Sequence, residues 1–88
     1  MNKDFLIKKI YYIEELVFKC NFHEVIKETV EIVENIEENF KFSKEENQRI
    51  WKEIIYYLTL SLENKDYLLA SDILKYELKT VLQNENLF

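Results

Sequence analysis

Glycine and proline are both absent from this 88-residue chain. Tight turns between β-strands depend on glycine, on Asn-Gly pairs or on proline, so a sheet of several strands is disfavoured. Connections between helices can be built from Asn, Asp, Ser and Lys instead. The two absences therefore predict an all-α fold.

The residues that carry most protein chemistry are also scarce. Cys20 is the single cysteine and His23 the single histidine, so an internal disulfide is excluded and a zinc site lacks its usual three or four ligands. No glycine-rich phosphate loop exists, and no serine has a histidine at a spacing typical of a nucleophile. We expect no enzymatic activity, no metal and no cofactor, and we interpret Cys20 as a small core residue.

A basic surface is missing as well. The formal net charge is −5, whereas nucleic-acid binding draws on a patch of Lys and Arg, so no nucleic-acid partner is expected. Charged residues interrupt every apolar run long before the ~20 residues that a bilayer requires, and no signal-peptide pattern is present. These features, with the lone cysteine, predict a cytoplasmic protein without membrane insertion. The excess of Lys over Arg suggests a bacterial genome rich in A and T.

Bulky apolar side chains are abundant instead. Hydrophobic residues make up 48 % of the chain, including six Phe, six Tyr and one Trp. A chain of this length has room for one domain, residues 1–88, and buries only about 60–65 % of its unfolded surface. Part of the apolar surface is therefore expected to remain outside the core.

Four amphipathic segments, separated by short polar breaks, follow one another along the chain. We expect helices at about 3–20, 22–39, 44–63 and 67–83. Asn21 suits a left-handed helix end, Asp66 suits an N-cap, and Ser43 with Glu46 has the spacing of a capping box. The tail around Leu87 and Phe88 is expected to fray or to dock on the helices.

Short connections favour antiparallel neighbours, so the expected architecture is an up-down four-helix bundle made of two helical hairpins. The break at Asn21 is short enough that the first two segments remain open to a second interpretation, as one bent helix. Charges favour the hairpin. Lysines 3, 8 and 9 begin the first segment and glutamates 34, 37 and 38 end the second, and an antiparallel hairpin brings these sets together. Glu28 is assigned to the solvent face of the second segment.

Glu77 is the one polar residue inside an apolar arc. At about 100° per residue it projects between Ala70, Ile73 and Val81. A buried carboxylate needs a partner, so a contact that sets the packing register is one interpretation. The other is that Glu77 faces a ligand or protein partner across an opening.

The first segment has nearly two apolar stripes. Its broad arc, Phe5, Leu6, Ile10, Tyr12, Ile13, Leu16, Val17 and Cys20, is assigned to the core, and a second stripe consists of Ile7, Tyr11 and Phe18. The third segment adds Tyr56 and Leu60 outside its core arc of Ile50, Trp51, Ile54, Ile55, Tyr57, Leu58 and Leu62. Either other elements cover these residues, or Ile7, Tyr11, Phe18, Tyr56 and Leu60 form a protein interface, because such centres favour aromatic residues.

One segment carries a family resemblance. Residues 64–78, NKDYLLASDILKYEL, resemble a segment of small uncharacterised helical proteins from low-GC Gram-positive bacteria, some of which are associated with flagellar genes. The resemblance implies a cytoplasmic accessory protein, similar in role to the small helical chaperones of flagellar export. It supplies no site residues.

Taken together, these features predict a non-enzymatic helical interaction module that forms a homodimer. The alternative is a small cytoplasmic chaperone or regulator that binds an amphipathic helix of a flagellar or secreted partner. A further hypothesis has the acidic face of the second segment docking on a basic protein.

Overall fold

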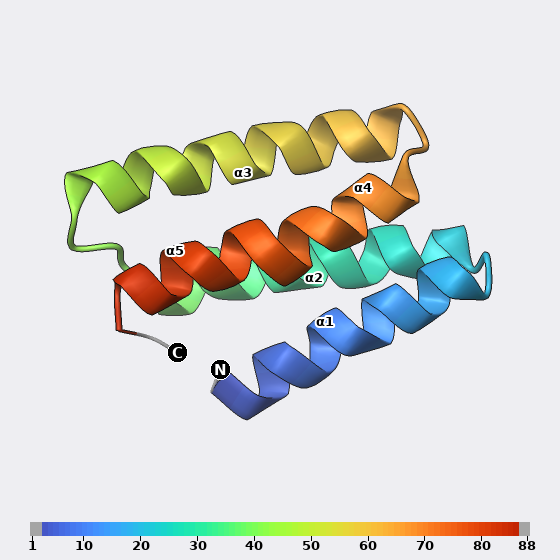
Figure 1. The fold of residues 1–88 in the computed structure, drawn as a ribbon, viewed down its shortest axis with the longest axis horizontal. Coiled ribbons are helices and arrows are strands. Elements are labelled where there is room, and N and C mark those ends of the chain that lie inside the picture. Colours follow the sequence, from blue (N-terminus) through green and yellow to red (C-terminus); the bar gives the residue numbers. More distant parts are fainter. Residues whose placement is uncertain (1–2, 87–88) are drawn as a thin grey trace.

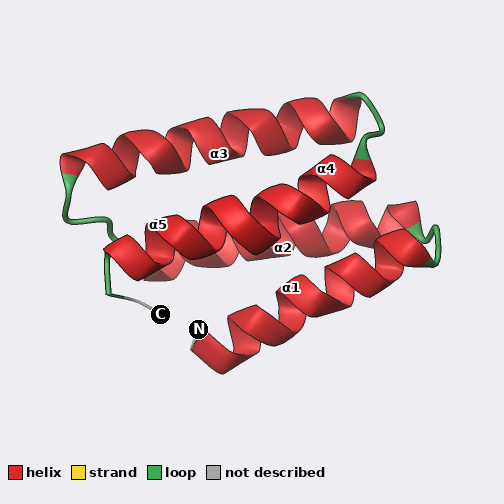
Figure 2. Cartoon of the chain, in the orientation of Figure 1, coloured by secondary structure: helices red, strands yellow, loops and turns green. Residues whose placement is uncertain are grey.

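A computed structural model describes residues 3–86 as four helices, with no strand in that range (Figures 1 and 2). The first three are α1 (Lys3–Phe18), α2 (Phe22–Asn39) and α3 (Glu45–Glu63). The fourth helix is continuous but consists of α4 (Tyr67–Asp72), the π-helical segment η1 (Ile73–Leu78) and α5 (Lys79–Asn84). The all-α four-helix prediction is confirmed, and the expected docking of Leu87 and Phe88 lies outside the described residues.

The helices alternate in direction as an up-down bundle. In Figure 1 the fourth helix lies between α3 and α1, and α2 lies behind it. Backbones pack closely between α1 and α2, between α1 and the fourth helix, and between α3 and the fourth helix. Because α1 and α2 are separate antiparallel helices, the interpretation as one bent helix is wrong. Within residues 3–86 no helix is long and apolar enough to cross a membrane.

All four helices contribute to one core. Each presents apolar residues at helical spacing toward the bundle centre, and Phe42 from the connection between α2 and α3 joins them. The buried residues of the core are Leu6, Ile10, Ile13, Leu16, Val25, Ile32, Ile36, Phe42, Trp51, Ile54, Leu58, Ala70, Ile73, Leu74, Leu78, Val81 and Leu82. Several large apolar residues are substantially exposed. They are Phe5, Tyr12 and Tyr57, which were assigned to the core from the sequence, and Phe22, Ile26 and Val30 of α2. The apolar arcs are wider than the neighbouring helices can cover.

Three helix ends use the left-handed conformation without glycine, and the last of them is at Asn86 after α5, with φ 61°. At the end of α1 the left-handed residue is Cys20, with φ 58°, and not Asn21, whose φ is −91°. The Asn21 amide donates to the Leu16 carbonyl over 2.9 Å, as in a Schellman motif. Because Cys20 forms this exposed turn, its assignment to the core is wrong. Lys65 plays the same part after α3, with φ 59°.

The start of α3 is held by a residue from the far end of the chain. The predicted capping box does not form, because Lys44 is the N-cap and no side chain caps the helix. The Glu85 carboxylate takes that place: it accepts from the Ser43 amide over 2.5 Å, from the Lys44 amide over 3.3 Å and from Asn47 Nδ2 over 2.7 Å. The hydrogen bond from Asn47 is the largest cause of a lowered pKa for Glu85, and the Ser43 and Lys44 amides lower it further against the opposing effect of burial. The predicted Asp66 cap is confirmed, since its carboxylate accepts from the Leu69 amide over 3.1 Å.

The π-helical segment explains why Glu77 is exposed. Ala70, Leu74, Leu78 and Leu82 are all fully buried and are spaced by four residues. A regular α-helix rotates by about 40° over each such step, so this stripe would turn away from the core. The wider π-turn at Ile73–Leu78 absorbs that rotation and moves Glu77 out of the apolar arc. The prediction that Glu77 lies among core residues is therefore wrong.

Candidate interaction surface

The described residues contain no group of three or more His, Cys, Asp and Glu side chains that could hold a metal ion. Cys20 and His23 are both exposed. The described residues form an ion network between two helices and several surface grooves.

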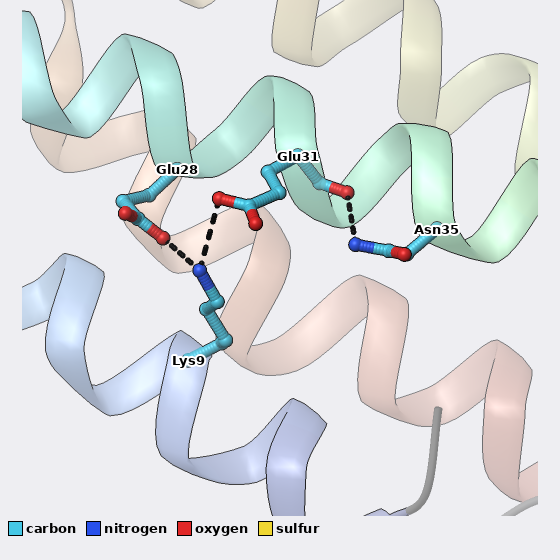
Figure 3. A network of polar contacts seen from close by, with 4 residues as sticks. All are labelled: Lys9, Glu28, Glu31 and Asn35. Carbon is cyan, nitrogen blue, oxygen red and sulfur yellow. Dashed lines mark hydrogen bonds and ion pairs between the residues drawn. The ribbon is translucent and has the colours of Figure 1, made fainter.

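A partly buried ion network joins α1 to α2 (Figure 3). Lys9 of α1 reaches across to the Glu28 carboxylate and also contacts Glu31 over 3.0 Å. Glu28 is only 8 % exposed, which corrects its assignment to the solvent face. Burial would lower the pKa of the Lys9 ammonium, but its hydrogen bonds to both carboxylates and their charges outweigh burial and raise the pKa.

The network confirms the idea of charge attraction within the first hairpin but corrects its partners. Lys9 was expected to face the acidic end of α2, whereas it meets carboxylates nearer the middle of that helix. Glu37 instead accepts a hydrogen bond of 2.9 Å from Trp51 Nε1 of α3. The Lys9 contacts join α1 to α2, and the Glu37–Trp51 hydrogen bond joins α2 to α3. Both therefore stabilise the packing of the helices.

A first groove lies between α1 and the fourth helix. It has a volume of about 350 Å³, and two lysines of the fourth helix line it, so we name it the basic groove. Its lining residues are Ile7, Ile10, Tyr11, Lys75, Tyr76, Lys79, Thr80 and Gln83. Lys75 contacts Glu14 of α1 over 3.0 Å, and this hydrogen bond and charge raise the pKa of Lys75. Lys79 has no ion pair or side-chain hydrogen bond with any described residue.

A second groove lies on the other flank of the fourth helix, against α3. It has a volume of about 320 Å³, and two glutamates line it, so we name it the acidic groove. Its lining residues are Ile50, Glu53, Ile54, Tyr57, Leu69, Ile73 and Glu77. Neither glutamate has an ion pair or hydrogen bond through its side chain within the described part of the chain. The fourth helix therefore separates two apolar grooves of opposite charge.

The structure brings together only part of the predicted interface. Ile7 and Tyr11 both line the basic groove. Phe18 is 91 % exposed at the end of α1, and Tyr56 is 57 % exposed on α3, where its ring packs edge-on against Tyr57. Leu60 is half-buried on the same helix. None of the five residues is buried, but Phe18, Tyr56 and Leu60 line neither groove.

The sequence interpretation missed three residues of this surface. Tyr57 was assigned to the core, and Leu69 and Tyr76 were not singled out, yet these side chains are 55 %, 46 % and 58 % exposed in the grooves. Their signal is weak, because Tyr57 and Leu69 each precede a buried residue, and Tyr76 stands between two charged residues. Only the positions of α1 and α3 around the fourth helix show that they share one face.

A third groove separates α2 from α3. Its volume is about 280 Å³ and its lining is mostly apolar: Thr29, Val30, Val33, Glu34, Ile55, Leu58, Thr59 and Leu62. Thr29 is 1 % exposed, and its hydroxyl has no hydrogen-bond partner among the described residues. The backbones of α2 and α3 are not among the closely packed pairs, so the bundle is more open along this edge than between α1 and α2.

Comparison of the chain with models of known protein families, with curated proteins and with solved structures finds no match.

Proposed function

We propose that this chain is a non-enzymatic helical interaction module that forms a homodimer through the face made by α1, the fourth helix and α3. One observation carries the proposal: three tyrosines and Leu69 remain exposed on that face while the same helices contribute to one buried core. Tyr11, Tyr57, Leu69 and Tyr76 are each 46–58 % exposed there, around two apolar grooves. Contiguous apolar surface of this kind, rich in tyrosine, is typical of protein interfaces.

The residue types also suit association better than small-molecule chemistry. A tyrosine side chain offers a large contact area with only two rotatable angles to restrict, and its hydroxyl tolerates water before the partner binds. Lys79, Glu53 and Glu77 lie beside these apolar groups, where a polar rim is usual. The proposed setting is the cytoplasm of a bacterium, as the sequence suggests.

Oligomeric state tests the proposal. Wild-type protein at tens of micromolar is expected to sediment as a dimer. Tyr11→Glu places a charge inside the basic groove and should yield a monomer, because the desolvated carboxylate opposes association. Tyr12→Glu is the matched control: Tyr12 is 44 % exposed on the same helix and lines neither groove. A wild-type monomer, or equal loss of dimer in both variants, contradicts the proposal.

The α2–α3 groove supports a second candidate, a small chaperone or regulator that holds an amphipathic helix of a flagellar or secreted partner. The groove is apolar along both helices and contains the unpartnered Thr29 hydroxyl. Helix-in-groove binding uses such surfaces. Val30→Asp, at a position 44 % exposed in this groove, should abolish capture of a flagellar protein in the native host and leave the homodimer intact. Capture that survives Val30→Asp would exclude this groove.

A further inference from the structure

The two grooves beside the fourth helix differ in charge, and this difference selects how two copies can meet. Joining basic groove to basic groove would place Lys79 against Lys79. Joining acidic groove to acidic groove would place Glu53 and Glu77 against their own copies. Like charges in contact disfavour both arrangements, whereas basic against acidic brings unpaired opposite charges together.

We propose that the homodimer joins the basic groove of each copy to the acidic groove of the other. In this arrangement Lys79 of one copy lies opposite Glu53 and Glu77 of the second copy, while the tyrosines and the aliphatic residues of the grooves pack between them. The inference depends on the proposed homodimer and adds its pairing and its symmetry.

A two-fold axis parallel to the fourth helix produces this pairing. Rotation about such an axis places the α1 flank of one copy against the α3 flank of the other. It does not shift the copies along the helix direction, so equivalent residues of the fourth helices lie at the same height. Lys79 and Glu77 are two residues apart, or about 3 Å along the helix axis. The opposite charges of the two copies therefore meet at nearly the same level, and they do so twice in each dimer.

If two copies met head to tail through only one basic–acidic contact, one groove would remain open at each end of the pair. Further copies could then bind to these open grooves. A closed dimer uses both grooves of both copies. The pairing thus predicts a dimer that does not grow into chains as its concentration rises.

Charge exchange tests the pairing. Lys79→Glu alone, and Glu53→Lys with Glu77→Lys alone, should each raise the dimer Kd by about tenfold or more, because both contacts in each homodimer become repulsive. An equimolar mixture of the two should form heterodimers with a Kd within about threefold of wild type, since one contact is native and the other is exchanged. With one of the two variants uniformly labelled with ¹⁵N, native mass spectrometry separates the two homodimers and the heterodimer by mass.

Glu38→Lys is the matched control. It makes the same charge change as Glu77→Lys, on an exposed residue of α2 that lines neither groove and has no ion pair among the described residues. Its dimer Kd should equal that of the wild type. Lys79→Gln, which removes the attraction without adding repulsion, should weaken the dimer less than Lys79→Glu. Circular dichroism of every variant establishes that it is folded.

The outcomes separate this inference from the proposed function. A wild-type dimer that persists unchanged in Lys79→Glu, or a mixture that stays monomeric, overturns the groove pairing and leaves the homodimer standing. Preferential pairing of Lys79→Glu with wild type would indicate that two basic grooves meet, which also overturns it. A wild-type monomer defeats the proposed function itself.

Discussion

Removing the Lys9 ammonium should destabilise the bundle more than its surface position suggests. In Lys9→Met the aliphatic stem keeps its packing, but the Glu28 carboxylate, in a residue only 8 % exposed, loses its closest cation. Breaking a fully buried ion pair costs about 3–5 kcal/mol, and a hydrogen bond to a charged group contributes about 1.5–3 kcal/mol. Here the two side chains are 17 % and 10 % exposed, so we expect a loss of about 1–3 kcal/mol.

That loss is large for a chain of this size. At about 0.05–0.15 kcal/mol per residue, an 88-residue domain unfolds with roughly 4–13 kcal/mol. Each kcal/mol shifts Tm by about 4–8 °C in a domain of this length, so Lys9→Met should lower Tm by roughly 10 °C. Urea unfolding followed by circular dichroism gives the free energy of unfolding directly, with an unchanged m-value expected.

Lys19→Met is the matched control. Lys19 directly follows α1 and also contacts a glutamate, Glu15, over 2.9 Å, but these side chains are 65 % and 59 % exposed. Solvent screens such a pair, and its loss should change the free energy of unfolding by less than about 0.5 kcal/mol. The double variant Lys9→Met/Glu28→Leu should recover most of the lost stability, because no buried unpaired carboxylate remains and Glu31, 47 % exposed, is solvated by water. Equal effects of Lys9→Met and Lys19→Met would refute the reasoning.

The same network predicts a dependence on alkaline pH. The folded-state pKa of Lys9 is raised above its ordinary value of 10.5. The contribution of Lys9 to the free energy of unfolding is therefore fully present below pH 10.5. It is lost as pH rises through the higher folded-state pKa. In urea titrations at increasing pH, the wild type should lose stability in that window, and Lys9→Met should lose less. Parallel curves for the two proteins would contradict this assignment.

Three further predictions follow from the backbone and the far end of the chain. The folded-state pKa of Glu85 is lowered. Its contribution to the free energy of unfolding is therefore present above its ordinary pKa of 4.5 and is lost as pH falls through the lower folded-state pKa. Glu85→Gln should remove this acid-dependent loss of stability in unfolding titrations. Deleting Glu77 should convert the π-turn to α-helix, and unfolding followed by circular dichroism should remain cooperative. Deleting Lys27 of α2 should rotate buried residues of that helix outward and abolish cooperative unfolding. Lys65→Gly should raise the free energy of unfolding by about 0.5–1 kcal/mol, because Lys65 has a φ of 59°, which glycine adopts without steric cost. Lys52→Gly, within α3, should lower the free energy of unfolding by about 1 kcal/mol. A change of the same sign in both variants would contradict this explanation.

The number, type and approximate bounds of the helices follow from local features of the sequence. Missing glycine and proline, four segments with helical spacing and the Asp66 cap each depend on residues close together in the chain. The structure confirms four helices, whose ends differ from the predictions by at most two residues. Local signals suffice here because a helix is built from contacts between near neighbours.

The candidate surface was predicted only in part. Helical periodicity fixes the direction of Ile7 and Tyr11 around α1, and it marks them correctly as outside the core. It cannot show which helix stands in that direction. Tyr57, Leu69 and Tyr76 share a face with Tyr11 only because α1 and α3 pack on opposite flanks of the fourth helix.

Contacts between distant residues decided the rest. Glu85 displaces the expected Ser43 capping box from 42 residues away, and Lys9 selects Glu28 and Glu31 from the many carboxylates of α2. The exposure of Glu77 has the same origin, since the π-turn keeps a stripe of four-residue spacing against the core. The sequence by itself determined that four helices form. The tertiary structure decided which residues of different helices contact one another and which remain exposed. These outcomes depend on packing, because the burial of apolar residues competes with ideal helix geometry only once the helices are packed.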